Sequence, residues 1–110
     1  MAEEFTVERS KITRRPVHPG VFFERNILPE FLRQRRTIGE IATLLGVSRQ
    51  ALHRVMAGQS AITTDMAVRL GKLCGNGPDL WLNLQGRYDA WEAAHRLANE
   101  LKKIPTLREE

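Results

Sequence analysis

The spacing of apolar residues predicts helices along most of the chain. Ile41, Ala42 and Leu45 lie three, four and seven positions after Ile38, which is the repeat of one helix face. Helical spacing recurs in the stretches that follow, and no stretch shows the strict apolar and polar alternation of a half-buried strand. The pattern therefore predicts an all-α fold with five helices.

The residues that border the 37–46 stretch define one helix. Thr37 and Glu40 have the spacing of a capping box, in which the Thr37 hydroxyl accepts the Glu40 N–H and the Glu40 carboxylate accepts the Thr37 N–H. Gly46 follows the last apolar residue and can take the left-handed conformation that ends a helix. A helix is therefore expected to begin at Thr37 and to end at Gly46.

The other four helices are predicted from similar signals. Proline at the first helical position and Ser or Thr at the N-cap start helices, whereas a glycine beyond the last turn ends them. The expected starts are Pro19, Ser48, Thr63 or Thr64, and Pro78. Pro29, Gly58 and Gly75 mark the ends of the first three, and the last helix is expected to be long and to extend as far as Lys103.

A chain of 110 residues is long enough for one domain with its own core. Residues 1–17 contain few apolar side chains and are expected to form a flexible N-terminal arm. Residues 18–104 are expected to form the helical domain, and residues 105–110 a C-terminal tail.

Cysteine content and hydropathy predict a cytoplasmic protein. Cys74 is the one cysteine of the chain, so no internal disulfide can form, and it is expected to pack as a small apolar residue. No apolar run reaches the roughly 18 residues needed to span a bilayer, and the acidic start at Glu3 and Glu4 is unlike the cationic start of a signal peptide.

Residues 37–57 have the parts of a helix-turn-helix unit, which consists of two short helices joined by a turn that contains glycine. Gly46 makes the turn, and Ala42 is small at the point where the second helix would cross the first. Burial of Leu52 and Val55 would hold the two helices at one angle. The unit predicts DNA binding, with the second helix in the major groove.

The outward side of that second helix supplies the candidate DNA contacts. With Leu52 and Val55 buried, a rotation of about 100° per residue turns the polar side chains near the helix start outward. Arginine can donate two hydrogen bonds to guanine, and glutamine can pair with adenine. The candidate base readers are therefore Arg49, Gln50 and Arg54, and the candidate phosphate contacts are Ser48 and His53.

The charge distribution favours a polyanionic partner. The formal net charge is +4, the sequence pI is near 9.8, and the stretch from Ile41 to Thr64 contains no carboxylate. A solvated polar face would explain any one of these residues alone, but together they favour DNA binding. The predicted DNA-binding set also includes Thr37 and the basic cluster of Arg33, Arg35 and Arg36, which would add salt-sensitive attraction to phosphates.

The sequence offers little support for an enzyme. His18, His53 and His95 have no metal-ligand spacing with one another or with Cys74. No glycine-rich phosphate loop or nucleophile motif is present. We therefore expect no catalytic residues, no metal and no cofactor.

Several segments between His18 and Trp91 match one known group. They are His18-Pro-Gly, the run from Ile41 to Gly58, Ala61-Ile-Thr, Met66-Ala-Val-Arg-Leu70 and Pro78-Asp-Leu-Trp-Leu-Asn-Leu-Gln85. On these residues the chain resembles the HigA-type antitoxins, members of the lambda-repressor-like helix-turn-helix proteins. The resemblance implies a homodimer that binds operator DNA, represses its operon and neutralises a cognate HigB-type toxin of the RelE-like, mRNA-cleaving class.

Two departures from the group leave other functions open. Ile38 stands where relatives often have a polar residue that contacts phosphate, and the Gln59-Ser-Ala61 stretch lacks the usual basic residue. Operator affinity is therefore expected to depend more on the basic cluster at 33–36. A solitary helix-turn-helix regulator without a toxin and a protein-binding inhibitor that has lost DNA contact remain alternatives.

The last helix has apolar residues at intervals of three and four positions, so one of its sides is expected to be apolar and to pack against another apolar surface. Leu80, Trp81 and Leu84 can either cover the core of the domain or pair with a second copy. A toxin would bind either the arm at 1–17 or a face of this helix. The predicted dimer interface consists of Leu84, Tyr88, Trp91, Ala94 and Leu101.

Overall fold

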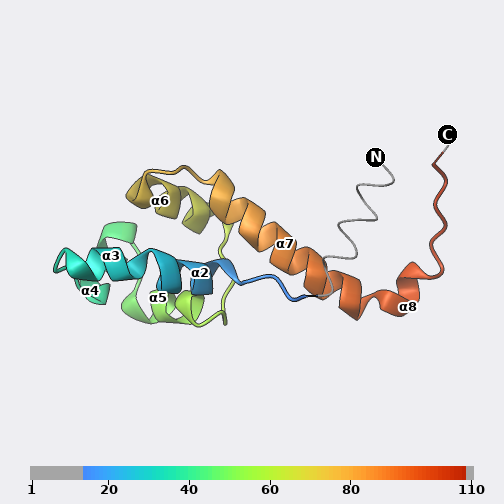
Figure 1. Ribbon diagram of the computed structural model, residues 1–110, viewed down its shortest axis with the longest axis horizontal. Coiled ribbons are helices and arrows are strands. Elements are labelled where there is room, and N and C mark those ends of the chain that lie inside the picture. The colour runs from blue at the N-terminus through green and yellow to red at the C-terminus, as the bar shows by residue number, and fades with distance from the viewer. Residues whose placement is uncertain (1–13, 109–110) are drawn as a thin grey trace.

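The helices of the domain pack around one tryptophan. The computed structural model describes residues 14–108, and all regular elements within that range are helices (Figure 1). They are α2 (Pro19–Asn26), α3 (Leu28–Arg33), α4 (Ile38–Leu45), α5 (Arg49–Met56), α6 (Thr64–Cys74), α7 (Asp79–Arg96) and α8 (Ala98–Leu101). The all-α prediction is confirmed, and the five expected helices are joined by two short ones, α3 and α8.

The two short helices arise where the expected helices are interrupted. Pro29 lies in the first turn of α3, where the missing N–H has no intrahelical partner to lose, so it starts a helix instead of ending one. At the other end of the domain, Leu97 separates α7 from α8, so the last helix does not run unbroken to Lys103. Pro78 is the N-cap of α7 and not its first residue, so the helix begins at Asp79, one residue later than expected.

The predicted caps account for the start of the central helices. The Thr37 N–H donates to Glu40 Oε1 at 2.9 Å, and the Glu40 N–H donates to Thr37 Oγ1 at 3.1 Å, which completes the capping box. Ser48 Oγ accepts the Ala51 N–H at 3.0 Å at the start of α5. At the start of α6 the cap is Thr63 and not Thr64. Local sequence therefore fixes where these helices begin.

Trp81 of α7 is the centre of the core. It is fully buried, and its ring meets the edges of Phe22 and Phe23 of α2 at centroid distances of 6.0 and 6.1 Å. A buried aromatic side chain removes a large apolar area from water, so this contact joins the first and last parts of the domain. The other large core side chains are Leu28, Ile41, Leu45, Leu52, Val55, Met56, Ile62, Met66 and Leu70.

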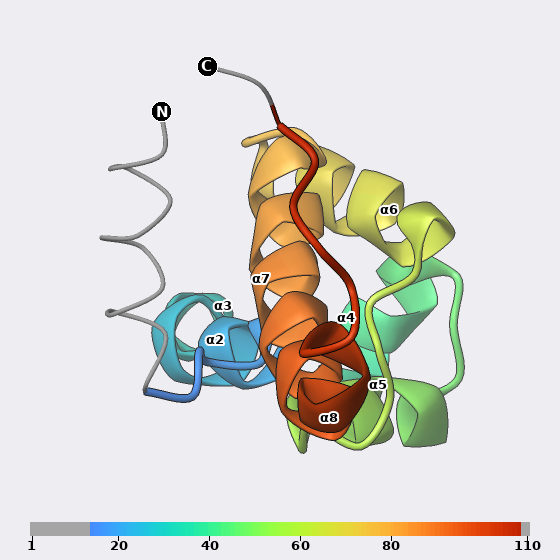
Figure 2. The same cartoon turned by 90° about the vertical axis from the view of Figure 1, so that its right-hand side faces the viewer.

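The C-terminal half of α7 projects from this core. The structure extends 55 Å along its longest axis and only 24 and 22 Å along the others. Figure 1 shows α7 running away from α2 to α6, with α8 at its far end, and Figure 2 views the molecule from that end. Leu97, Leu101 and Ile104 are 38, 46 and 64% exposed there. Among residues 14–108, nothing therefore covers these apolar side chains at this end of the domain.

Helix α2 lies directly on α5, and a glycine makes the close approach possible. A Cβ at Gly20 would stand 1.8 Å from the carbonyl oxygen of Val55. Gly20 is buried, so the added atom could not turn into solvent. The absence of a side chain at Gly20 therefore sets how closely α2 supports the helix-turn-helix unit.

Replacing Gly20 with Ala should destabilise the domain by about 3 kcal/mol, because α2 and α5 must move apart to admit the methyl group. The free energy of unfolding from urea denaturation measures the effect. Gly86→Ala is the matched control, since a Cβ at that helical position meets nothing within 4 Å. The control should gain roughly 0.5–1 kcal/mol from helix propensity. Equal stabilities for Gly20→Ala and the unmodified protein would contradict this account of the packing.

Candidate nucleic-acid interface

Helices α4 and α5 form the predicted helix-turn-helix unit. Ala42 and Leu45 of α4 and Leu52 and Val55 of α5 are all buried between the two helices and their neighbours. Gly46 adopts the expected left-handed conformation with φ +77°. Burial of these side chains holds α5 at a fixed angle to α4.

An arginine from α6 supports the turn between the two helices. Arg69 Nη1 donates a hydrogen bond of 2.8 Å to the carbonyl oxygen of Leu45 at the end of α4. A Cβ at Gly46 would lie only 2.5 Å from the same nitrogen, so a side chain there would displace the Arg69 guanidinium, while the φ angle of the turn itself favours glycine. Cationic side chains at helix C-termini are favourable because they satisfy free carbonyls. The sequence analysis missed Arg69, and nothing in the local pattern distinguishes it from other exposed helical arginines.

The structure places the five candidate residues of α5 and its N-cap on one accessible side. Leu52, Val55 and Met56 are buried on the opposite side of the helix. The accessible residues are Ser48, Arg49, Gln50, His53 and Arg54, all of them exposed. Nothing within the described chain covers the face that would enter a groove. DNA contact by these residues stays a prediction.

The basic cluster before α4 is also exposed, but its members differ in their surroundings. Arg33 forms an ion pair with Glu30 one turn earlier on α3, and this pair lowers the pKa of the Glu30 carboxyl. Arg35 and Arg36 follow α3, and Thr37 begins the next helix. Glu30 therefore compensates part of the Arg33 charge. Of the three arginines, Arg35 and Arg36 are the ones expected to attract phosphates more strongly.

Arg35 has an unusual backbone conformation. Its φ of +69° lies in the left-handed region, and among the described residues no other non-glycine residue has a positive φ. The Arg35 N–H donates to Leu32 O and the Arg36 N–H donates to Phe31 O, which is the Schellman pattern at a helix end. Glycine usually occupies this position, so the chain retains an arginine where the backbone favours a smaller residue.

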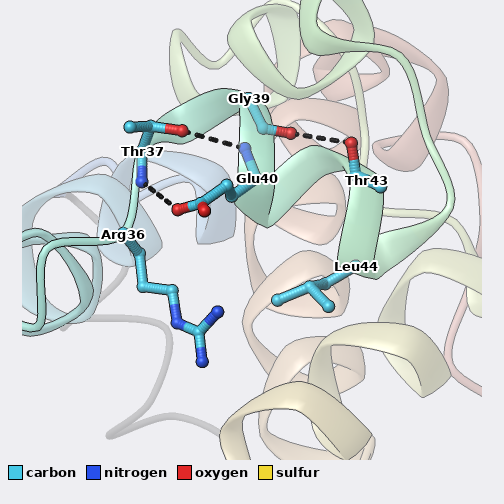
Figure 3. Close-up of a pocket in the computed structure, with 6 residues that line it drawn as sticks. All are labelled: Arg36, Thr37, Gly39, Glu40, Thr43 and Leu44. Carbon is cyan, nitrogen blue, oxygen red and sulfur yellow. Dashed lines mark hydrogen bonds between the residues drawn. The ribbon is translucent and has the colours of Figure 1, made fainter.

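Two shallow depressions border the unit. One, of about 510 Å³, lies along α4 and is lined by Arg36, Thr37, Gly39, Glu40, Thr43 and Leu44 (Figure 3). In Figure 3 the side chains of Arg36 and Leu44 reach toward the same open space beside the helix. The other, of about 430 Å³, lies between α2, α4 and α5 and includes Arg25, Ile38 and His53. Arg25 thus adds a basic residue near His53 that the sequence analysis did not single out.

His18 connects the start of the domain to the loop after α5. Its Nδ1 accepts the Gly20 N–H at 2.9 Å as the N-cap of α2, and its ring meets the edge of the Tyr88 ring at 5.0 Å. Burial lowers the pKa of His18, against the opposing effects of a hydrogen bond to the Ser60 backbone and of the charge on Asp89. The His18-Pro-Gly segment carries the resemblance, but the sequence did not predict this capping role.

The predicted dimer residues do not share one exposed face. Leu84 packs against the core, and Tyr88 lies against His18. At about 100° per residue, Ala94 is turned roughly 80° from Leu84 around α7. Ala94 and Leu101 are exposed. Leu84 and Tyr88 therefore make contacts within the domain, while Ala94 and Leu101 remain accessible. Pairing between copies through these residues stays a prediction.

Arg15 packs against the side of α7 that bears Tyr88. Its Nη2 donates to Tyr88 OH at 2.5 Å and to Glu92 Oε2 at 2.9 Å. Its guanidinium carbon lies 5.3 Å from the Tyr88 ring centroid and 5.7 Å from that of Trp91. Residues 14–17 of the predicted arm thus contact α7 through Arg15, while residues 1–13 lie outside the described part of the chain.

Residues 14–108 contain little that would support another kind of site. No group of three or more His, Cys, Asp or Glu residues in this range could hold a metal ion. None of the helices in the same range is both long and apolar enough to cross a membrane. Cys74 is half-buried, and burial raises the pKa of its thiol, so the reactive thiolate is disfavoured.

Comparison with known proteins relates this arrangement to a family. A family defined as a helix-turn-helix domain matches residues 28–84. The uncharacterized helix-turn-helix-type transcriptional regulator YbaQ of Escherichia coli K12 is 37% identical over 100 residues, which cover 88% of this chain and 85% of that protein. Antitoxin HigA-1 of Vibrio cholerae is 32% identical over 98 residues, which cover 88% and 89% of the two chains.

A solved structure extends the likeness to three dimensions. The structure of Pseudomonas aeruginosa antitoxin HigA with the higBA promoter superposes with a TM-score of 0.76 at 29% identity. The superposition covers 86% of this chain and all of that one. The likeness therefore includes the helix-turn-helix unit and most of the helices packed around it.

Stability should fall as the pH drops below about 6.5, the ordinary pKa of histidine. Because the folded-state pKa of His18 is lowered, the unfolded chain binds the proton first, and the stability due to neutral His18 is lost between the two pKa values. Urea denaturation over about pH 5 to 8 measures this slope. His18→Asn keeps a capping oxygen but cannot titrate, so its slope should be flatter. Equal slopes in both proteins would assign the acid sensitivity to other groups.

Proposed function

Because this chain belongs to the helix-turn-helix family that includes the HigA antitoxins, we propose that it is a repressor that reads operator DNA with α5. Members of this family are DNA-binding regulators and antitoxins rather than enzymes. The observation that carries the proposal is the exposed polar side of α5, which presents Arg49, Gln50 and Arg54 beside a stretch without carboxylates. Such a surface can approach a polyanion without repulsion.

Each candidate contact has a chemical role in the proposed complex. Arg49 and Arg54 would donate paired hydrogen bonds to guanine, and Gln50 would pair with adenine. Ser48, His53 and Thr37 would contact phosphates, which fix the register without reading sequence. The Ser48 and Thr37 oxygens already accept backbone N–H groups as caps, so their hydroxyl protons remain available for donation. Arg33, Arg35 and Arg36 would add attraction to the DNA backbone, with Arg33 weakened by its pairing to Glu30.

The proposed assembly is a homodimer on a palindromic operator. Two copies related by a two-fold axis would place their α5 helices about 34 Å apart, one turn of DNA. The exposed apolar residues at the far end of α7 and beyond, including Ala94 and Leu101, favour pairing there. A dimer would double the number of phosphate contacts.

The antitoxin part of the proposal is neutralisation of a cognate HigB-type, RelE-like toxin. Support comes from the antitoxin relative in Vibrio cholerae, whose likeness covers 88% of this chain. The alternative is a solitary transcriptional regulator, which the likeness to YbaQ favours, since that protein is named as an uncharacterized transcriptional regulator. A small protein encoded in the neighbouring reading frame would favour the antitoxin over the solitary regulator.

Replacing Arg49 and Arg54 together with Ala should weaken operator binding on the order of 100-fold, because two paired donors to bases are lost. Fluorescence anisotropy with a duplex selected by the unmodified protein from a randomised library measures the affinity. The matched control replaces Arg87 and Arg96, two exposed arginines of α7, and so removes the same charge away from α5.

The control should lose much less affinity than the Arg49 and Arg54 variant. Unchanged affinity after loss of Arg49 and Arg54 would rule out these residues as readers. If the protein is also an antitoxin, the same variant should still neutralise the toxin in coexpressing cells. Loss of both activities would mean that the two functions share one surface.

Operator affinity should fall steeply as salt is added. The logarithm of the association constant is expected to decrease linearly with the logarithm of salt concentration, with a slope of about 0.9 per phosphate neutralised. Arg36→Ala should reduce that slope by about one unit if Arg36 contacts a phosphate. A salt-independent affinity would be inconsistent with binding through the basic surface.

A further inference from the structure

Gly39, the second residue of α4, is a glycine that the fold itself does not require. A Cβ at this position would meet Arg49 Cδ and Thr37 Oγ1, each at 3.8 Å, which is ordinary van der Waals contact. Gly39 is not among the glycines with positive φ. By contrast, Gly20 and Gly71 lie against backbone atoms that a Cβ would strike at 1.8 and 2.3 Å.

Glycine in a helix is costly, so its presence calls for a reason. Among ordinary residues, only proline is a poorer helix former than glycine. Glycine is used where a backbone must come close to another molecule. Since the described part of the chain leaves room for a methyl group at Gly39, the reason for a glycine at this position lies outside that part of the chain.

The surroundings of Gly39 are those of the proposed DNA site. The side-chain stem of Arg49 comes from α5 to within 3.8 Å of a Cβ placed at Gly39, and the hydroxyl of Thr37 lies at the same distance from that Cβ. Gly39 also lines the depression that contains Arg36 and Thr37 (Figure 3). A side chain longer than a methyl group would therefore enter the space between Arg49 and the first turn of α4.

We propose that Gly39 is a specificity-determining position that sets the reach of Arg49. Without a side chain at Gly39, Arg49 lies along the first turn of α4 and its guanidinium approaches the duplex from that side. A bulky residue would push the Arg49 stem away and change which base pair its guanidinium meets. The inference rests on the proposed role of α5 as the reading helix.

A double-mutant cycle tests the inference. The variants are Gly39→Leu, Arg49→Ala and the two combined, and the probe is a duplex selected by the unmodified protein from a randomised library. Gly39→Leu should bind this duplex at least tenfold more weakly, as should Arg49→Ala. The combined variant should be no more than about twofold weaker than Arg49→Ala alone, because Gly39→Leu acts through Arg49.

Gly86→Leu is the matched control, because Gly86 is an exposed helical glycine of α7 with open space around it. It should leave DNA affinity unchanged. Thermal denaturation of all variants separates loss of binding from loss of folding, and a midpoint for Gly39→Leu at or above that of the unmodified protein is expected. If Gly39→Leu does not fold, Gly39→Met, whose side chain is also longer than a methyl group, takes its place, and a new library selection should return a changed base at the position that Arg49 reads.

The outcomes distinguish the inference from the proposed function. Full affinity for Gly39→Leu, an additive cycle, or an unchanged selected sequence for Gly39→Met would overturn the role of Gly39 while Arg49→Ala still showed the reading role of α5. Full affinity for Arg49→Ala would overturn the reading role itself, and the role of Gly39 with it.

Discussion

The hydrogen bond from Arg69 to the Leu45 carbonyl holds the turn on which the orientation of α5 depends. Gly46 gives that turn its left-handed backbone and leaves room for the guanidinium. Near the C-terminal end of α5, Gly20 lets α2 pack against the backbone of Val55. The helix that presents Arg49, Gln50 and Arg54 is therefore held near both of its ends by groups outside its polar face.

The loop that follows α5 is also held in place by a group from another helix. Gln85 of α7 is buried, its Oε1 accepts the Ile62 N–H at 2.7 Å, and its Nε2 donates to Asp89 at 2.9 Å. A buried backbone N–H without a partner would cost free energy, so Gln85 both satisfies that group and fixes the loop to α7. His18, the N-cap of α2, adds a second contact with α7, where its ring meets the Tyr88 ring at a centroid distance of 5.0 Å. Helix α7 is thus joined to the reading unit by polar contacts as well as by the packing of Trp81.

Local features of the sequence were predicted well because they depend on neighbouring residues. The capping box at Thr37, the N-cap at Ser48 and the left-handed Gly46 each follow from a few adjacent side chains. Contacts between distant residues were not predicted: Arg69 with Leu45, and Arg15 with Tyr88, are separated by 24 and 73 positions. Periodicity alone also placed Leu84 and Ala94 in one predicted dimer interface, because it could not show that the domain already covers the side bearing Leu84.

The projecting part of α7 separates two surfaces of different character. Within residues 14–108, α5 lies toward one end of the structure, which is 55 Å long, and α8 with its exposed Leu101 lies at the other (Figure 1). A duplex would be held at α5 by short-range contacts with phosphates and base edges. A second copy paired at the far end, as proposed, would leave α5 unobstructed, so the elongated shape would let dimerisation and DNA contact occur on one chain without competing.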